Sequence, residues 1–521
     1  MREHIDMNVP CYFRRSGNGV LIAAALSLSG CVLGPDYQPP RPAMPEVFNS
    51  MQAQQGAKPL ASATRADWWK AFNDPQLDSL IERAVQGNLS LQQAVLRIAG
   101  ARQQLNQARG AWAPSVSSNA RFTRQQLGVK GELESQGIDD RLNGVDNADS
   151  VRPALDSLEK PIGLYQGSFD ASWELDLWGK VRRQVEMADA RQQQSAEERN
   201  DALVSLEAEV ARAYLQLRGA QAITQTIETQ IDVAQQTLDL TQSQQRNGLA
   251  PQTNVENARA QLSSLRAQLP QYQAQIHQAM NGLAVLTGQV PGALDAELTA
   301  RKALPVLPPA VSVGVPSELA RRRPDVRAAE ASLHAATASI GVSVAQLFPS
   351  LSLSGQFGMR NSDASYLDNW SSHFYSFGPS VTLPIFQGGR LVSNVKLARA
   401  QQASAALQYR QTVLTALQDV ENALVSYRSD RQQVTGLDES VQALQNAFNL
   451  ASDGYRQGLS SFIEPLDAQR QLAQVQQQAE QARVQSRLDL VALYKALGGG
   501  WESWQKVNLP DYPVFGAAEN P

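Results

Sequence analysis

The chain carries two copies of one ordered set of short motifs, and this internal repeat limits its possible folds more than any other feature. Residues 113–116 (APSV) correspond to 348–351 (FPSL), and residues 246–249 (RNGL) correspond to 456–459 (RQGL). Chance similarity between Gln- and Ala-rich helices would not keep these motifs in the same order. A repeat of this length is one structural unit used twice. Each half is therefore expected to contain a helix, a strand, a loop, a second strand and two very long helices joined by a tight glycine turn.

The order of the motifs predicts the division of the chain. We expect a first repeat at 67–300, a second repeat at 301–500 and a C-terminal tail at 501–521. The expected strands lie near 113–126, 166–178, 347–359 and 377–387.

The expected strands alternate between apolar and polar side chains. Phe169, Ala171 and Trp173, for example, alternate with Asp170 and Ser172. Period-two alternation places one row of side chains on each face of a sheet, which a half-buried soluble sheet would also show. Four strands of about ten residues are each long enough to cross a bilayer. A four-stranded sheet in lipid would leave its edge N–H and C=O groups unpaired, so copies of the same chain are expected to close it.

The helices between the strands and the glycine turns are unusually long. A straight helix over residues 182–246 would measure roughly 100 Å at about 1.5 Å per residue. Leu203, Leu206, Val210 and Leu217 belong to a stripe with coiled-coil spacing. Pro270 lies inside the first returning helix and is expected to kink it.

The N-terminus has the features of a bacterial lipoprotein signal. Arg14 and Arg15 precede a short apolar run at 20–28, and the sequence LSGC ends at Cys31. Residues 1–30 are therefore expected to be a signal peptide, and residues 31–66 a lipidated, Pro-rich tether. An ordinary cleaved signal with a chance cysteine is the alternative. No later segment has the 18 consecutive apolar residues of a transmembrane helix.

Composition excludes several classes of protein. The net charge of −4 argues against a nucleic-acid partner, which would favour a basic face. Cys11 and Cys31 are the two cysteines, so no disulfide framework or Cys-based metal site is expected. The four histidines are scattered without a catalytic motif, so neither an enzyme nor a bound cofactor is expected. The basic run 321–323 is interpreted as a solvated helix start.

Several motifs together resemble one family. These are the DWW start at 67–69 and the segments 31–40 (CVLGPDYQPP), 322–326 (RRPDV), 383–389 (LPIFQGG) and 455–458 (YRQG). With them, the chain over residues 16–500 resembles the outer-membrane efflux lipoproteins of NodT type in the TolC-like outer-membrane factor family. The resemblance implies a mixed α and β membrane protein, a homotrimer whose twelve-stranded barrel continues as an α-helical periplasmic tunnel.

The resemblance also implies a function and partners. It implies the outer-membrane channel of a tripartite efflux system, which passively exports drugs or other toxic compounds from a Gram-negative bacterium. The expected partners are a periplasmic adaptor, an inner-membrane pump of the resistance-nodulation-division class and outer-membrane lipid. Cys31 is expected to carry S-diacylglycerol and N-palmitoyl groups, and Val32 after it favours sorting to the outer membrane.

A periplasmic gate is expected after the second glycine turn. Glu464 and Asp467 are three residues apart and share a helix face. Carboxylates favoured by the helix dipole would give the same pattern. By resemblance, these acids line the closed mouth as a cation-favouring constriction, and Tyr455 helps to hold it shut. Ser460 stands where some family members carry an arginine latch.

The helix-turn tips are the expected adaptor contact, although they are also plain hairpin turns. The expected contact residues are Asn247, Gly248, Leu249, Gln457, Gly458 and Leu459. A periplasmic adaptor protein is the competing reading of the whole chain, but it would normally have one hairpin and a Gly-rich lipoyl-like domain. A lipoprotein enzyme is the third reading, and it lacks a catalytic constellation.

Overall fold

The computed structural model describes residues 32–41, 44–52, 66–126, 131, 135–137, 161–308, 311 and 315–505. The expected signal peptide, Cys31, part of the tether, most of the loop between the first two strands and most of the C-terminal tail lie outside these residues. The chain forms two compact units. Unit 1 comprises residues 1–37, 104–188 and 336–401, and unit 2 comprises residues 38–103, 189–335 and 402–521.

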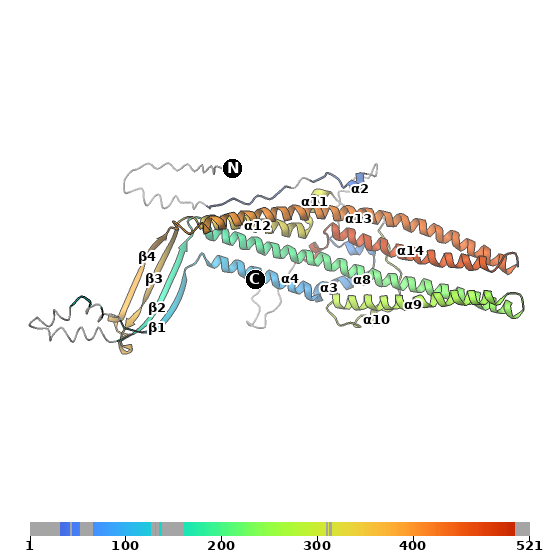
Figure 1. Cartoon of the computed structure of the whole chain (residues 1–521), viewed down its shortest axis with the longest axis horizontal. Helices are drawn as coiled ribbons and strands as arrows, with labels where there is room; N and C mark the ends of the chain where they lie inside the picture. The colour runs from blue at the N-terminus through green and yellow to red at the C-terminus, as the bar shows by residue number, and fades with distance from the viewer. Residues whose placement is uncertain are drawn as a thin grey trace, which may run out of the picture. The chain divides into compact units, whose positions relative to one another are not determined.

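Unit 1 contains one antiparallel sheet of four strands in the order β1-β2-β3-β4 (Figure 1). The strands are β1 (Ser115–Gln125), β2 (Ile162–Leu175), β3 (Ser350–Asn361) and β4 (His373–Thr382). Two short 3-10 turns, Ala364–Tyr366 and Trp370–Ser372, connect β3 to β4. Strands β1 and β4 are therefore the two edges of the sheet.

Local chemistry sets the strand ends. Strand β2 stops at Leu175, earlier than the expected 178, because Asp176 caps the following helix. The carboxylate oxygens of Asp176 accept the N–H groups of Val181 and Arg182, each at 2.9 Å. Strand β4 occupies residues 373–382 instead of the expected 377–387. Its end lies just before Pro384, which has no N–H to donate to a ladder.

Four long helices follow the strands as two hairpins. Helix α8 (Lys180–Arg246) turns back into α9 (Gln252–Leu286), and α13 (Arg390–Arg456) turns back into α14 (Ile463–Ala496) (Figure 1). Helix α9 continues through Pro270 to Leu286. No helix of the described chain combines the length and apolarity needed to cross a bilayer.

Helices α4 (Leu89–Gly110) and α12 (Pro324–Ala345) each precede a strand, and their starts reveal the repeat. Asn88 Nδ2 donates to Leu286 O at the end of α9, at 3.0 Å. Arg323 Nη1 donates to Ala496 O at the end of α14, also at 3.0 Å. The same contact is thus made in both halves, so the predicted repeat is confirmed.

Arg323 also corrects the interpretation of the basic run as a solvated helix start. This residue is 9% exposed, and its side chain forms ion pairs with Asp325 and Asp419 at 2.8 and 3.1 Å. Arg322 pairs with Glu502 at 2.9 Å. The final carbonyl groups of α14 lack intrahelical partners, and a buried cation that reaches them needs carboxylates to compensate its charge.

The core of unit 2 gathers short elements around the long helices. These elements are α2 (Asn49–Gln52), η1 (Trp68–Phe72), α3 (Pro75–Gly87), α10 (Asp295–Leu298), α11 (Pro316–Arg322) and η4 (Trp501–Trp504). Trp68, Phe72 and Leu80 pack in one apolar cluster with Tyr214 of α8 and Leu490 of α14.

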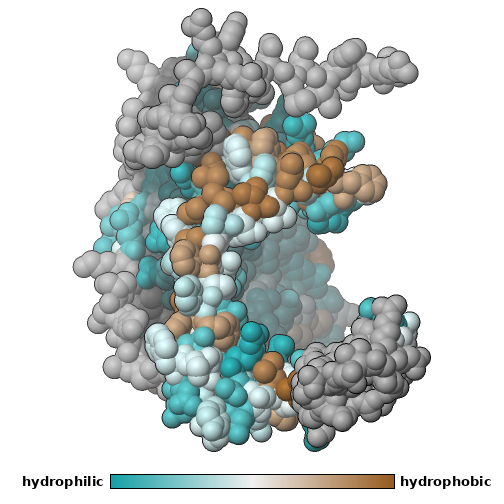
Figure 2. Space-filling model, turned by 90° about the vertical axis from the view of Figure 1, so that its left-hand side faces the viewer, coloured by the Kyte–Doolittle hydropathy of each residue, from teal (hydrophilic) through white to brown (hydrophobic). Residues whose placement is uncertain are grey.

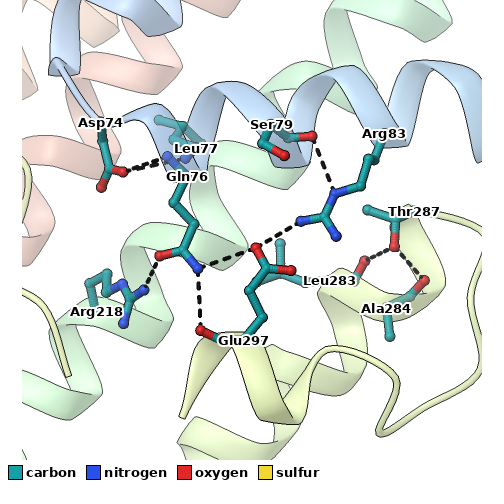
Figure 3. Close-up of polar contacts among 10 residues, drawn as sticks. All are labelled: Asp74, Gln76, Leu77, Ser79, Arg83, Arg218, Leu283, Ala284, Thr287 and Glu297. Carbon is teal, nitrogen blue, oxygen red and sulfur yellow. Dashed lines mark hydrogen bonds and ion pairs between the residues drawn. The ribbon is translucent and has the colours of Figure 1, made fainter. Parts of the chain in front are cut away.

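A polar network joins two of these elements, α3 and α10, to the long helix α8 (Figure 3). Asp74 Oδ1 caps α3 and accepts the Gln76 N–H at 2.9 Å. Arg218 of α8 is fully buried and donates to Gln76 Oε1 at 2.6 Å. Glu297 of α10 accepts from Gln76 Nε2 at 3.3 Å and pairs with Arg83 at 3.0 Å. The Nη atoms of the buried guanidinium therefore donate to neutral acceptors, one of which, Gln76, belongs to α3.

Candidate functional site

One face of the sheet is apolar from edge to edge. The register places Phe169 opposite Phe357, and Phe357 opposite Tyr375. Phe377 and Val381 of β4 are 81% and 67% exposed in the single chain. Figure 2 shows brown, hydrophobic side chains gathered in patches on the face that it views. The apolar row is Val116, Phe122, Tyr165, Phe169, Trp173, Leu351, Leu353, Phe357, Met359, Tyr375, Phe377 and Val381.

The opposite face of the sheet is polar. Asp170 accepts from Asn119 Nδ2 at 2.6 Å and from Ser168 Oγ at 3.1 Å. A cavity of about 370 Å³ lies on this face and is lined by Ser115, Ser117, Asp170, Ser172, Ser354, Gln356 and Ser376, among others. The sheet therefore separates an apolar surface from a polar one.

Aromatic side chains cluster at both ends of the strands. The rings of Phe122 and Tyr165 are 4.6 Å apart at the end of the sheet next to the loops. At the other end, Trp178 lies 5.1 Å from Phe348, and its Nε1 donates to Pro349 O at 2.7 Å. Two aromatic belts that flank an apolar band are typical of membrane-spanning strands.

The segment after Cys31 is held within unit 1. Leu33 N donates to Trp178 O at 3.1 Å. Arg183, 3% exposed, pairs with Asp36 at 2.6 Å. Gly34 has a φ of 91°, and a Cβ at this position would lie 2.5 Å from Gly341 Cα, so no other residue fits. The chain is thus fixed within a few residues of the predicted lipidation site, beside the strand-to-helix junction.

The two hairpin tips have the same backbone motif. Gly248 and Gly458 have φ values of 69° and 74°. Leu249 N donates to Gln244 O at 2.9 Å, and Leu459 N donates to Gly454 O at 2.8 Å, which completes a Schellman cap in each hairpin. Leu249 and Leu459 are 78% and 77% exposed. Both tips therefore present an apolar side chain; the neighbouring Asn247 and Gln457 are exposed polar residues.

The structure separates the three expected gate residues. Glu464 and Asp467 are exposed on one face of α14, and Asp467 accepts from Gln471 Nε2 at 2.7 Å. Tyr455 is half-buried, with its ring 5.4 Å from that of Phe462. Its hydroxyl donates to Gln244 Oε1 of α8, and burial raises the pKa of this phenol. Tyr455 thus holds the two hairpins of one chain together, whereas the two carboxylates face outward.

Gln244 is the partner of Tyr455 in this contact, and the sequence did not indicate it. It lies in a Gln-rich helix end, and periodicity cannot distinguish a glutamine that forms a hydrogen bond to a neighbouring helix from one in solvent.

Within the described ranges, no group of three or more His, Cys, Asp or Glu side chains could hold a metal ion.

A two-faced sheet that continues into paired helix hairpins defines a class of membrane channel proteins. The chain belongs to the family described as "Outer membrane efflux protein", whose model matches residues 80–289 and 315–499. It is 31% identical to Nodulation protein T of Rhizobium leguminosarum bv. viciae over 499 residues, which cover 95% of this chain and 96% of the relative.

Two further comparisons agree with this assignment. The toluene efflux pump outer membrane protein TtgC of Pseudomonas putida is 30% identical, over 92% of this chain and 95% of the relative. The solved structure of the outer-membrane channel OprN superposes with a TM-score of 0.80 and 32% identity, and the match covers 91% of this chain and 100% of OprN.

Proposed function

We propose that three copies of this chain form the outer-membrane exit duct of a tripartite efflux system. The observation that carries this proposal is the four-stranded sheet with one apolar face, one polar face and two open edges. In lipid, unpaired edge groups cost several kcal/mol each, and pairing β1 of one copy with β4 of the next removes this cost. The apolar faces then contact lipid and the polar faces line the pore. Closure requires several copies, and the family supports three.

Export through this duct is passive and weakly selective. The proposed pore face carries mainly small polar side chains, Ser172 and Ser354 among them. A wide polar duct excludes few solutes, so the pump that delivers the solutes determines which of them are exported. The name of the toluene efflux relative supports small toxic compounds as substrates.

The helix tips are the proposed contact with a periplasmic adaptor, which links the duct to an inner-membrane pump of the resistance-nodulation-division class. Exposed Leu249 and Leu459 occupy equivalent positions of the two repeats. Apolar residues presented singly on rigid turns suit a partner with shallow apolar grooves. Both tips can therefore be bound in the same way.

Reconstitution tests the duct itself. Protein extracted from outer membranes in detergent should have the native mass of three chains and should conduct ions in a planar bilayer. Deletion of the gene should lower resistance to at least one compound of a toxic panel. A folded monomer that inserts stably into bilayers would contradict the proposal.

A second experiment tests the proposed gate at Glu464 and Asp467. With three copies, six carboxylates would surround the axis and attract multivalent cations. Glu464→Ala combined with Asp467→Ala should raise the half-blocking concentration of hexamminecobalt(III) by about tenfold or more, because block depends on this local potential. The matched control is Asp239→Ala with Glu256→Ala, which removes two exposed carboxylates from the first hairpin. Equal block in both double variants would place the constriction elsewhere.

The lipid anchor has its own test. We propose that Cys31 carries diacylglycerol and palmitate and attaches the protein to the outer membrane, because several acyl chains together anchor stably. Cys31→Ser should abolish metabolic labelling with a palmitate analogue. Cys11→Ser should leave labelling unchanged, since Cys11 lies within the expected signal peptide. Labelling that survives Cys31→Ser would exclude this site.

A further inference from the structure

The polar face of the sheet carries two arginine side chains at one level, near the loops. The register places Arg121 of β1 opposite Gln166 of β2, and Gln166 opposite Arg360 of β3. Arg121 lies two residues from Asn119, which bonds to Asp170 on the polar face, so the whole row points to that face. Adjacent strands are about 4.8 Å apart, and the backbones of the two arginines are therefore separated by roughly 10 Å. We call Arg121, Gln166 and Arg360 the arginine row.

Both arginines can be reached by a solute on this face. Arg121 and Arg360 are exposed in the single chain. The guanidinium carbon of Arg360 lies over the ring of Phe374, 5.1 Å from its centre. Stacking of this kind uses the face of the guanidinium group and leaves its N–H groups to donate elsewhere. The contact with Phe374 therefore positions Arg360 without neutralising its charge.

The carboxylates of the sheet are paired with other groups. Asp170 and Glu174 are the two carboxylate residues of the four strands. Glu174 forms an ion pair with Lys180 at 2.9 Å, and Asp170 accepts from Asn119 at 2.6 Å. Asp170 also lies four residues from Gln166 along β2, which is about 13 Å at about 3.3 Å per residue. The strands therefore supply no carboxylate that compensates the arginine row.

We propose that the arginine row binds multivalent anions at the outer end of the pore. This inference rests on the proposed function, in which three copies enclose one pore and the loops face the exterior. Two arginines from each copy then place six guanidinium groups around the pore at one level, and rings of arginine side chains favour anions. Like charges around one pore repel each other, and a bound multivalent anion offsets several of them at once.

The chemistry of arginine defines the class of ligand. Its planar fork of N–H groups matches the oxygen atoms of phosphate and sulfate groups, and bonds between two charged groups are the strong ones. Solutes that carry several such groups are therefore the expected ligands. The same ring repels cations, so it opposes the return of cationic compounds from the exterior while neutral compounds pass. The outer end of the pore thus has the opposite charge preference to the proposed gate.

Single-channel recording in planar bilayers tests the site. Hexacyanoferrate(II), a small anion with four charges, is added on the side that the loops face. Arg121→Gln combined with Arg360→Gln should raise its half-blocking concentration by about tenfold or more, because the local positive potential is lost. If the double variant does not assemble, Arg121→Gln alone removes half of the ring and should give a smaller rise.

Arg124→Gln is the matched control. Arg124 is exposed on the same strand but lies two residues from Phe122, on the apolar face. This variant removes the same charge from the opposite side of the sheet, so its block by hexacyanoferrate(II) should equal that of the wild type.

The outcomes separate this inference from the proposed function. Wild-type protein that forms no channel would contradict both. Conducting channels that are blocked equally in the wild type and in the variants of the arginine row would overturn the anion site, whereas the exit duct would stand. An equal rise in Arg124→Gln would show that overall charge, and not the arginine row, sets the block.

Discussion

At the scale of residues, Glu207 of α8 shows how one side chain contacts both the N-terminal and the C-terminal segments of unit 2. Its side chain has no solvent exposure, and Oε1 accepts from Trp504 Nε1 at 3.0 Å. A Cβ on Gly500 would lie 1.9 Å from Oε2 and 3.3 Å from Trp68 Nε1. The N-terminal Trp68 and the C-terminal Gly500 and Trp504 therefore close around this carboxyl group.

Burial raises the pKa of Glu207 well above its ordinary value of 4.5. The folded state therefore keeps its proton at pH values where the unfolded state has lost it. The stability linked to this group is complete below 4.5 and is lost as the pH rises through the folded pKa.

This linkage predicts the effect of Glu207→Gln. The variant stays neutral at every pH, so its stability should fall less than that of the wild type as the pH rises from about 5 to 8, by on the order of 1 kcal/mol in unfolding free energy. Thermal unfolding followed by circular dichroism measures the difference. Glu209→Gln, at an exposed position of α8, should follow the wild type. Parallel curves for wild type and Glu207→Gln would show that this carboxyl group does not carry the linkage.

At the scale of elements, close approach of α8 and α14 at Gly219 and Val484 decides where the two hairpins are locked together. The space is too small for any side chain at Gly219 while Val484 keeps its place. Elsewhere in a helix, glycine is about 1 kcal/mol less favourable than alanine, so helix propensity cannot account for it. Packing between the helices does.

Paired substitutions test this contact. Gly219→Ala should lower the unfolding free energy by about 1–3 kcal/mol through overpacking, despite the better helix propensity of alanine. Gly219→Ala with Val484→Ala should recover most of that loss, since the clashing methyl groups are gone. Urea unfolding of the four proteins of the cycle gives the coupling energy. Additive effects of the two substitutions would mean that the residues do not interact.

At the scale of the whole molecule, the two faces of the sheet determine whether the protein can enter a membrane. Phe377 lies on the apolar face, and its neighbour Ser376 lies on the polar face beside the cavity there. These adjacent residues are a matched pair for an experiment. A charge introduced at Phe377 would contact lipid, whereas the same charge at Ser376 would contact water.

A lysine at each position should therefore give opposite results. Phe377→Lys should cost about 2–4 kcal/mol in a bilayer and reduce the folded trimer in outer membranes. Ser376→Lys should assemble normally, with altered ion selectivity. Quantifying heat-resistant trimer on gels measures both. Normal assembly of Phe377→Lys would show that this face does not contact lipid.

The sequence by itself determined the features that depend on local pattern. Period-two alternation indicated the four strands, and the glycine motifs indicated the hairpin turns, because backbone geometry and side-chain spacing depend on neighbours along the chain. The strand bounds moved by a few residues where Asp176 became a helix cap and where Pro384 could not join a ladder.

Only the tertiary structure decided which polar side chains are buried and which partners they take. The basic run ending at Arg323 looked solvated, yet Asp419 and the end of α14 enclose Arg323. Gln244 accepts a hydrogen bond from Tyr455, and Gln469 is buried. Both lie in Gln-rich helices, whose composition does not indicate these surroundings. Burial and pairing arise between helices far apart in the sequence. The periodicity of one helix therefore does not indicate which neighbouring helix each glutamine will contact.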